Sequence, residues 1–278
     1  MLDTAAINII SAEARRRAGI AIPLAQTYLV EARLAPVARS EGYDSQADLV
    51  RALESSKDDR LWRRVVESLA DHETWFFRNP APLDYFMSDI LPVLARIKAR
   101  KAPIRILCAG CGTGQEAWSL AMLMQEQKAR LGAMDIEIVG TDISRRAIER
   151  AQSAAYSQFE VQRGLSIHRL IEHFEPYDQQ WVLKDSIKRW VRFERDNLLN
   201  PSEELGGFDI IFCRNVLTGM TPDARRHTLR MLAERSAPAG YLVLGKGETI
   251  SGAGELYRAM SGIKGVYART IEAARQAA

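Results

Sequence analysis

The sequence predicts an α/β protein with a doubly wound, mostly parallel sheet, preceded by an N-terminal helical domain and carrying a small antiparallel β insert. Three observations predict this fold. Residues 1–75 show helical spacing of apolar residues, strand and helix patterns alternate from about residue 104 onward, and Phe174–Val191 interrupts that alternation. We therefore expect a helical domain at 1–75 and a second domain at 76–278, with the insert at about 174–191.

The first domain is predicted from helical periodicity and from residues that begin or end helices. Apolar residues recur at helical spacing before Gly19, which ends the first helix, and Pro23 fits the first turn of the next one. Two further amphipathic segments are expected at Ser45–Leu53 and Leu61–Leu69. A helix at about Pro82–Lys98 follows the linker between the domains.

The second domain is predicted to alternate strands with helices, which implies a parallel sheet with right-handed crossovers. Strands are expected at Ile104–Cys108, Ile136–Gly140, Trp190–Phe193, Phe208–Cys213 and Tyr241–Leu244. Helices are expected at Gln115–Gln127, Ser144–Ser153 and Pro222–Arg235, and residues 271–278 read as a short Ala-rich helical or frayed tail. In such a fold the ligand lies at the carboxyl ends of the strands.

Composition and charge exclude several classes of protein. The 278 residues are 47% hydrophobic and 26% charged, which is ordinary for a soluble protein, and a net charge of +3 does not indicate a nucleic-acid-binding face. The sequence contains no apolar run near the roughly 18 residues that a membrane span needs and no signal-peptide pattern at its start. Three cysteines in apolar contexts fit a reducing compartment. We expect a cytoplasmic protein without membrane insertion.

A glycine-rich turn follows the strand expected at Ile104–Cys108. Gly110, Gly112 and Gly114 have the spacing G-x-G-x-G and precede Glu116. Glycines let a ligand lie directly on the backbone, and this spacing, tighter than the dinucleotide fingerprint, is usual in S-adenosylmethionine enzymes. Glu116 would pair with the amino group of that cofactor; the alternative is a structural turn whose acidic residue favours the helix dipole.

The next predicted strand runs into Asp142. An acidic residue at the tip of the second strand is where such folds hold the two ribose hydroxyls of an adenosine cofactor. The alternative is that Asp142 caps the helix that begins near Ser144. Together with the glycine turn, the ribose interpretation is the stronger one.

Several motifs, taken together, resemble the CheR-type chemoreceptor methyltransferases. They occur in the order found in that family, and they are His72–Arg78, Ala109–Leu120, Thr141–Ile143, Ala154–Tyr156, Asn197–Leu199 and Phe208–Leu217. The resemblance covers nearly the whole chain. It implies transfer of a methyl group from S-adenosylmethionine to glutamate side chains of bacterial chemoreceptors, with S-adenosylhomocysteine as the product and the cytoplasmic helical region of a receptor as the partner.

The resemblance also implies a set of site residues. The expected cofactor-binding residues are His72, Thr74, Arg78, Gly110, Glu116, Asp142, Asn197, Leu198, Asn215 and Val216. Asn197 and Leu198 would border the adenine, and Asn215 and Val216 would close the site beside the sulfonium. His72 stands where the family usually has Asn.

The expected chemistry needs little acid–base catalysis. A glutamate carboxylate, with a pKa of about 4.3, is already a nucleophile at neutral pH. Attack on a sulfonium methyl gains mainly from alignment and exclusion of water. Arg78 is the candidate catalytic residue because it could hold the substrate carboxylate by a charged hydrogen bond, and Arg214 is the alternative. No metal site is expected, since Cys108 and Cys111 lack a second pair of ligands.

Two departures from the family pattern bear on the acceptor. Gly219 stands at the position of a tyrosine near the reacting carboxylate, which leaves open a cofactor-sensing interaction module with little transferase activity. Phe174–Trp190 contains no glycine, whereas some relatives carry there a glycine-containing loop that docks a receptor tail. We therefore expect direct docking on the methylated helices. Methylation of RNA or of a small molecule is a third alternative. It is less favoured because the helical domain would then have no identified role.

Overall fold

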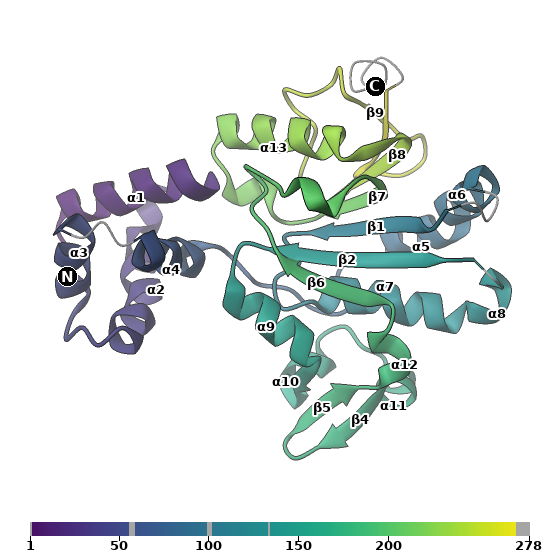
Figure 1. Ribbon diagram of the computed structural model, residues 1–278, viewed down its shortest axis with the longest axis horizontal. Helices are drawn as coiled ribbons and strands as arrows, with labels where there is room; N and C mark the ends of the chain where they lie inside the picture. Colours follow the sequence, from purple (N-terminus) through teal and green to yellow (C-terminus); the bar gives the residue numbers. More distant parts are fainter. Residues whose placement is uncertain (1, 56–58, 99–101, 133, 271–278) are drawn as a thin grey trace.

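The computed structural model describes residues 2–55, 59–98, 102–132 and 134–270 (Figure 1). Within these ranges the main sheet has seven strands in the order β6-β2-β1-β7-β8-β10-β9. Their bounds are β1 Ile104–Ala109, β2 Ile136–Asp142, β6 Val191–Arg195, β7 Phe208–Cys213, β8 Ser236–Leu244, β9 Tyr257–Ala259 and β10 Val266–Arg269. The first five in spatial order are parallel, and β10 and β9 are antiparallel to their neighbours. The doubly wound, mostly parallel sheet is confirmed, and the sequence did not predict β9 and β10.

Helices cover both faces of this sheet. Alternate residues of β1 point to opposite sides, so that Ile104, Ile106 and Cys108 belong to one apolar core and Leu107 and Ala109 to the other. The first core also takes in α7 (Gln115–Glu126) and α9 (Arg145–Ser153), and the second takes in α13 (Pro222–Glu234). Figure 1 shows α13 on one side of the sheet and α7 and α9 on the other. Short helical segments α8 (Lys128–Leu131) and η3 (Glu203–Leu205) join these elements.

The helix expected at Pro82–Lys98 has three parts. It consists of α5 (Ala81–Tyr85), a wider π turn η2 (Phe86–Ile90) and α6 (Leu91–Lys98). Pro92, two residues after the end of the π turn, has no backbone N–H to continue the α-helical hydrogen-bond pattern. The segment nevertheless buries Leu83, Phe86, Ile90 and Leu94 against the first core.

A second, three-stranded antiparallel sheet lies away from the main one at the bottom of Figure 1. It pairs β3 (Ala155–Ser157) and β4 (Phe174–Tyr177) with the central β5 (Gln180–Leu183). Helices α10 (Gln158–Gln162), α11 (Ile167–His173) and α12 (Asp185–Lys188) accompany it. The small antiparallel sheet is thus confirmed, but the predicted range 174–191 held only two of its strands; the third lies about twenty residues earlier.

The N-terminal helices form a separate apolar core. They are α1 (Thr4–Ala18), the short turn η1 (Leu24–Gln26), α2 (Thr27–Ser40), α3 (Gln46–Ser55) and α4 (Asp59–Leu69). Gly19 ends α1 in the left-handed conformation, with φ at 69°. The chain after Gly19 pairs with the loop that precedes α13: the Ala21 N–H donates to the Gly219 carbonyl at 2.9 Å, and the Thr221 N–H to the Gly19 carbonyl at 2.8 Å.

None of the helices in the described ranges is long and apolar enough to cross a membrane. The Ala-rich tail expected at residues 271–278 lies outside the described residues.

Candidate functional site

The glycine turn between β1 and α7 lies where the carboxyl ends of β1, β2 and β7 meet. Gly110 has a φ of 70°, and a Cβ atom there would stand 2.5 Å from Cγ2 of Val216. Any larger residue would therefore be strained and would clash. The Cys111 N–H donates to the Thr141 carbonyl at 2.8 Å, which fixes the turn against the end of β2. The turn thus brings bare backbone to the edge of the sheet.

Asp142, at the end of β2, anchors this turn. Its Oδ2 accepts the Gly112 N–H and its Oδ1 accepts the Ser144 N–H, both at 2.9 Å, and the residue is 6% exposed. The cap of α9 is Ser144, whose Oγ accepts the Ala147 N–H at 3.2 Å. The helix-capping role that was the alternative for Asp142 is therefore filled by Ser144. A carboxylate offers about four acceptor positions, so two remain for a ligand.

His72 contacts the same carboxylate from the linker that precedes the second domain. Its Nδ1 lies 3.4 Å from Oδ1 of Asp142, and its Nε2 lies 3.0 Å from the Glu67 carbonyl oxygen. Burial lowers the pKa of His72, but the nearby Asp142 carboxylate, the Glu67 carbonyl and the charge of Asp71 together outweigh burial, so the pKa is raised above its usual value. Protonation of the imidazole is thus favoured by its position beside Asp142.

A cavity of about 410 Å³ opens beside these residues. Seven of the residues predicted from the sequence line it: His72, Gly110, Asp142, Asn197, Leu198, Asn215 and Val216. The opposite wall comes from the N-terminal part of the chain, with Ala18, Ile20, Gln26, Leu29 and Arg33 among its lining residues. The sequence did not predict this wall, because no local motif marks it.

A much smaller cavity, of about 20 Å³, adjoins the first and shares His72, Gly110 and Asn215 with it. The remaining predicted residues, Thr74, Arg78 and Glu116, line this second cavity. The structure therefore places all ten predicted site residues around two neighbouring cavities at one edge of the sheet.

The two candidate arginines differ in what their guanidinium groups already bind. Arg214 is 7% exposed; it pairs with Glu116 at 2.6 Å and donates to the carbonyl oxygens of Arg78 and Asn79. Arg78 lies over the Trp75 ring, 3.9 Å from its centroid, and donates to the Glu73 carbonyl at 3.0 Å. Arg214 thus fastens the linker to the sheet, and Arg78 is the more accessible of the two.

Glu116 is held in a desolvated setting. Burial raises the pKa of Glu116, although Arg214 acts in the opposite direction. The carboxylate keeps a second oxygen free of Arg214 Nη1, which binds only Oε2. It lines the smaller cavity, where a ligand amino group would be an additional partner.

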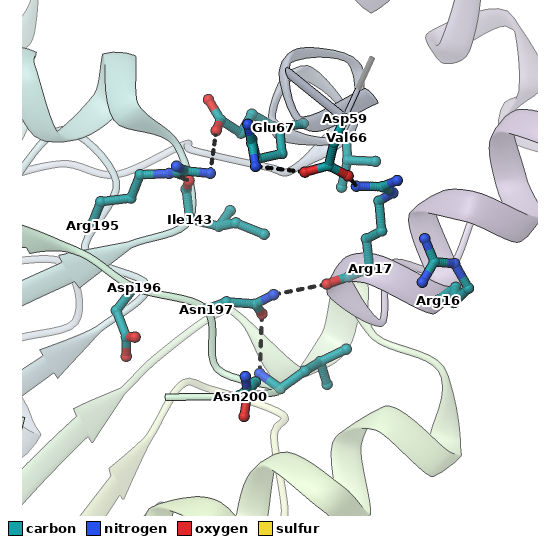
Figure 2. Close-up of a pocket in the computed structure, with 12 residues that line it drawn as sticks. Arg16, Arg17, Asp59, Val66, Glu67, Ile143, Arg195, Asp196, Asn197 and Asn200 are labelled. Atoms are coloured by element: carbon teal, nitrogen blue, oxygen red, sulfur yellow. Dashed lines mark hydrogen bonds and ion pairs between the residues drawn. The ribbon is translucent and has the colours of Figure 1, made fainter. Parts of the chain in front are cut away.

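Asn197 closes one side of the larger cavity by binding the N-terminal helices (Figure 2). Its Nδ2 donates to the Arg17 carbonyl at 2.8 Å, and its Oδ1 accepts the Leu199 N–H at 3.1 Å. Beyond it lies a charged cavity of about 770 Å³, crossed by an ion pair between Glu67 and Arg195 at 2.8 Å. Figure 2 shows these contacts joining α1 to the segment after β6, through Asn197, and α4 to the end of β6, through Arg195.

The cavity residues fit an adenosine-bearing ligand. A volume of about 410 Å³ lies within the range of about 300–1,000 Å³ that small-molecule sites occupy. Gly110 supplies backbone without a Cβ, and Asp142 keeps two acceptor positions for a pair of hydroxyls. Within the described ranges no group of three or more His, Cys, Asp or Glu side chains is arranged to hold a metal ion.

Comparison with protein families decides which ligand this is. Residues 72–266 match the model described as CheR methyltransferase, SAM binding domain, and residues 5–70 match the CheR methyltransferase, all-alpha domain. The chain belongs to the CheR methyltransferase family. S-adenosylmethionine is therefore the cofactor, as the glycine turn predicted.

Several relatives match this CheR methyltransferase along most of their own length. It is 35% identical to chemotaxis protein methyltransferase 1 of Vibrio cholerae, over 84% of this chain and 85% of that one. It is 31% identical to chemotaxis protein methyltransferase Cher2 of Pseudomonas putida, over 86% and 88%. Among solved structures, the S-adenosylmethionine-bound amino pentose methyltransferase CalS10 of Micromonospora echinaspora matches with a TM-score of 0.32 and 19% identity, over 63% of this chain and 58% of that one.

Proposed function

We propose that this CheR methyltransferase transfers methyl groups from S-adenosylmethionine to glutamate side chains of chemoreceptors in the cytoplasm, forming methyl esters in chemotaxis-type signalling. The observation that carries the proposal is the convergence of all ten predicted residues on two adjoining cavities. The names of the relatives, chemotaxis protein methyltransferases from Vibrio and Pseudomonas, support the choice of pathway.

The cofactor site divides between the two cavities. In the larger one Asp142 binds the ribose hydroxyls with its two remaining acceptor positions, and Asn197 and Leu198 border the adenine. In the smaller one Glu116 binds the amino group, and Thr74 and Arg78 lie on the same side. His72, Gly110 and Asn215 line both cavities and form the wall between these two ends, and Val216 lines the larger one.

The acceptor approaches along a basic groove of about 950 Å³ that runs between α2, α4 and the start of α9. Among the described residues that line it are seven arginines and two glutamates: Arg33, Arg60, Arg63, Arg64, Arg145, Arg146, Arg195, Glu67 and Glu149. His72 lines this groove as well as both cofactor cavities, so the groove adjoins the cofactor site. Several of its arginines pair with acidic residues: Arg60 and Arg64 with Glu41, Arg63 with Asp59, Arg145 with Glu149 and Arg195 with Glu67. The positive charge that remains in excess favours an acidic partner, which helices that carry several glutamates provide.

The chain contributes positioning and a dry, charged environment rather than proton transfer. When bound, S-adenosylmethionine supplies a methyl group activated by a sulfonium. The acceptor glutamate, with a pKa of about 4.3, arrives as a carboxylate and needs no general base. Arg78, at the rim of the smaller cavity, holds that carboxylate by a charged hydrogen bond, and alignment of this kind supplies roughly 7–11 kcal/mol in favourable cases.

The test is a methylation assay with a receptor cytoplasmic fragment. The chain is incubated with the fragment and methyl-labelled cofactor, and the fragment is then treated with mild base, which releases methanol from glutamate esters. Base-labile label on the fragment, lost when its acceptor glutamates are replaced by alanine, is the expected result. Label that resists base, or label on RNA or a small molecule instead, would contradict the proposal.

Gly219 favours a second candidate function, that of a cofactor-sensing interaction module with little transferase activity. A Cβ at Gly219 would meet no atom within 4 Å, so this part of the larger cavity lacks the wall that a tyrosine would give. The same assay separates the two functions. Binding of S-adenosylhomocysteine together with binding of the receptor fragment, but without ester formation, would favour the sensor.

A further inference from the structure

Glu248 lies in the loop after β8 and has no part in the site described above. Its side chain is 6% exposed and reaches under the loop that follows β7. Its Oε2 accepts the backbone N–H groups of Asn215 and Gly245, both at 2.7 Å, and its Oε1 accepts the Thr218 N–H at 3.1 Å. In the part of the chain that the structure describes, no lysine, arginine or histidine forms an ion pair with this carboxylate.

A buried carboxylate without a cation is costly unless backbone donors compensate it. Glu248 therefore depends on the three N–H groups, and they in turn are fixed by it. The packing around it is tight: a Cβ at Gly245 would stand 2.7 Å from Oε2 of Glu248 and 2.7 Å from the Asn215 nitrogen. The loop after β8 and the loop after β7 thus share one anionic centre.

One of the donors, Asn215, has a left-handed backbone. Its φ is 63°, in a region that asparagine adopts more readily than other residues that have a Cβ atom. Asn215 lines both cofactor cavities, and the adjacent Val216 packs against Gly110 of the glycine turn. The hydrogen bond from Asn215 to Glu248 therefore holds a residue of the cofactor-site wall in this left-handed conformation.

The third donor connects Glu248 to the N-terminal helices. Thr218 lies in the short helical turn η4 (Leu217–Gly219), and the carbonyl of Gly219 accepts the Ala21 N–H at 2.9 Å. Ala21 also lines the larger cavity. The Glu248 carboxylate thus positions two parts of the cavity wall. One is Asn215, and the other is the turn to which the N-terminal segment is hydrogen-bonded.

We propose that Glu248 is a positioning residue for the cofactor site: its carboxylate fixes the Asn215–Thr218 loop in the conformation that binds the cofactor. It acts through the loop and does not itself line either cavity. The proposal rests on the cofactor site and not on the identity of the acceptor, so S-adenosylhomocysteine is a sufficient probe.

The experiment compares Glu248→Gln with a control in which another buried carboxylate is neutralised. The control is Asp209→Asn, at the opposite end of β7: Asp209 is 3% exposed, accepts the Arg105 N–H at 2.9 Å and pairs with Lys98 at 3.0 Å. Both variants lose a buried charge that backbone N–H donors stabilise, and both are expected to unfold at a lower temperature. Only Glu248→Gln turns an amide NH₂ toward the loop donors.

Binding of S-adenosylhomocysteine is measured by calorimetry well below the unfolding temperature of each variant. We expect at least a fivefold loss of affinity in Glu248→Gln and less than a twofold change in Asp209→Asn. In turnover assays Glu248→Gln raises KM for the cofactor and lowers kcat, whereas the control leaves both unchanged. A folded Glu248→Gln variant that binds within twofold of the wild type would overturn the proposal.

Two further measurements keep the proposal testable if Glu248→Gln does not fold. Glu248→Asp keeps the charge but shortens the side chain by one methylene. If the position of the carboxylate matters, this variant also loses affinity for S-adenosylhomocysteine. Unchanged affinity counts against the proposal. Hydrogen exchange on the wild type needs no variant: the amides of Asn215, Thr218 and Gly245 exchange slowly. Rapid exchange at all three would refute it. Failure of the wild type to bind S-adenosylhomocysteine would instead refute the cofactor site itself.

Discussion

Replacement of Asp142 by alanine is the sharpest test of the cofactor site. The carboxylate has about four acceptor positions, of which the Gly112 and Ser144 N–H groups, both at 2.9 Å, use two. His72 Nδ1 lies 3.4 Å from Oδ1 but forms no hydrogen bond with the described residues, so two positions remain, and they match the two hydroxyls of a ribose. A hydrogen bond to a charged group contributes about 1.5–3 kcal/mol net, so two of them set an upper range of about 3–6 kcal/mol.

The measured loss will be smaller than that range, because water enters the space that the carboxylate leaves. We expect Asp142→Ala to weaken binding of S-adenosylhomocysteine by at least tenfold, which corresponds to about 1.4 kcal/mol. Isothermal titration calorimetry gives the affinity directly. The variant also loses two acceptors for backbone N–H groups, so its unfolding temperature falls as well.

A control separates affinity from stability. Ser144→Ala removes the cap of α9, where Oγ accepts the Ala147 N–H, and costs about 1 kcal/mol of stability while leaving Asp142 in place. Its affinity for S-adenosylhomocysteine should equal that of the wild type. If Asp142→Ala binds within twofold of the wild type, or if both variants lose affinity equally, the assignment of Asp142 to the ribose is wrong.

Three further predictions concern the surroundings of the site. A tyrosine side chain at position 219 would enter open space, so Gly219→Tyr should change the free energy of unfolding by less than about 1 kcal/mol. The variant should raise the initial rate of methyl transfer about threefold to tenfold. A slower rate would argue against a missing acceptor wall at Gly219. Arg214→Met leaves the Glu116 carboxylate buried and unpaired, at a cost of about 3–5 kcal/mol in urea unfolding. The double change Arg214→Met with Glu116→Gln should cost less, and an equal cost would contradict the pairing. Because Asp142 raises the pKa of His72 above its usual value of 6.5, the protonated imidazole stabilises the fold below about pH 6.5, and that contribution is lost as pH rises through the raised pKa. The difference in unfolding temperature between the wild type and His72→Asn should shrink over that interval, and a constant difference would count against the contact.

The parallel core of the fold was predicted well from the sequence because its strands and helices are marked by local residue patterns. The predicted strand Phe208–Cys213 agrees with β7 to the residue, and the helix predicted from Gln115 begins there in α7. Such segments are buried on both sides, and their apolar runs are bounded by turn residues. The glycine turn and Asp142 were found in the same way, since both are set by residues adjacent in the chain.

The parts that were missed are short or depend on distant contacts. Strands β3, β9 and β10 have three or four residues each, too few to show a period of two. No pattern in the sequence indicates that Ile20 bridges to Met220, because that pairing joins segments two hundred residues apart. The role of Glu248 was missed for the same reason: its three donors come from two loops that meet only in the folded chain.

This long-range pairing bears on the role of the N-terminal helices. If they served only to recognise a receptor, a methyltransferase acting on RNA or a small molecule would have no use for them. In the structure the N-terminal part of the chain also lines the proposed cofactor cavity, through Ile20, Leu29 and Arg33, and it is joined to the loop after β7 by backbone hydrogen bonds. A role in the proposed cofactor cavity would serve any acceptor, so the helical domain does not by itself favour a receptor. The feature on which we base the proposal of an acidic protein acceptor is the arginine-lined groove, which includes His72 among its lining residues. The proposed acceptor therefore rests on the charge of that groove rather than on the existence of the helical domain.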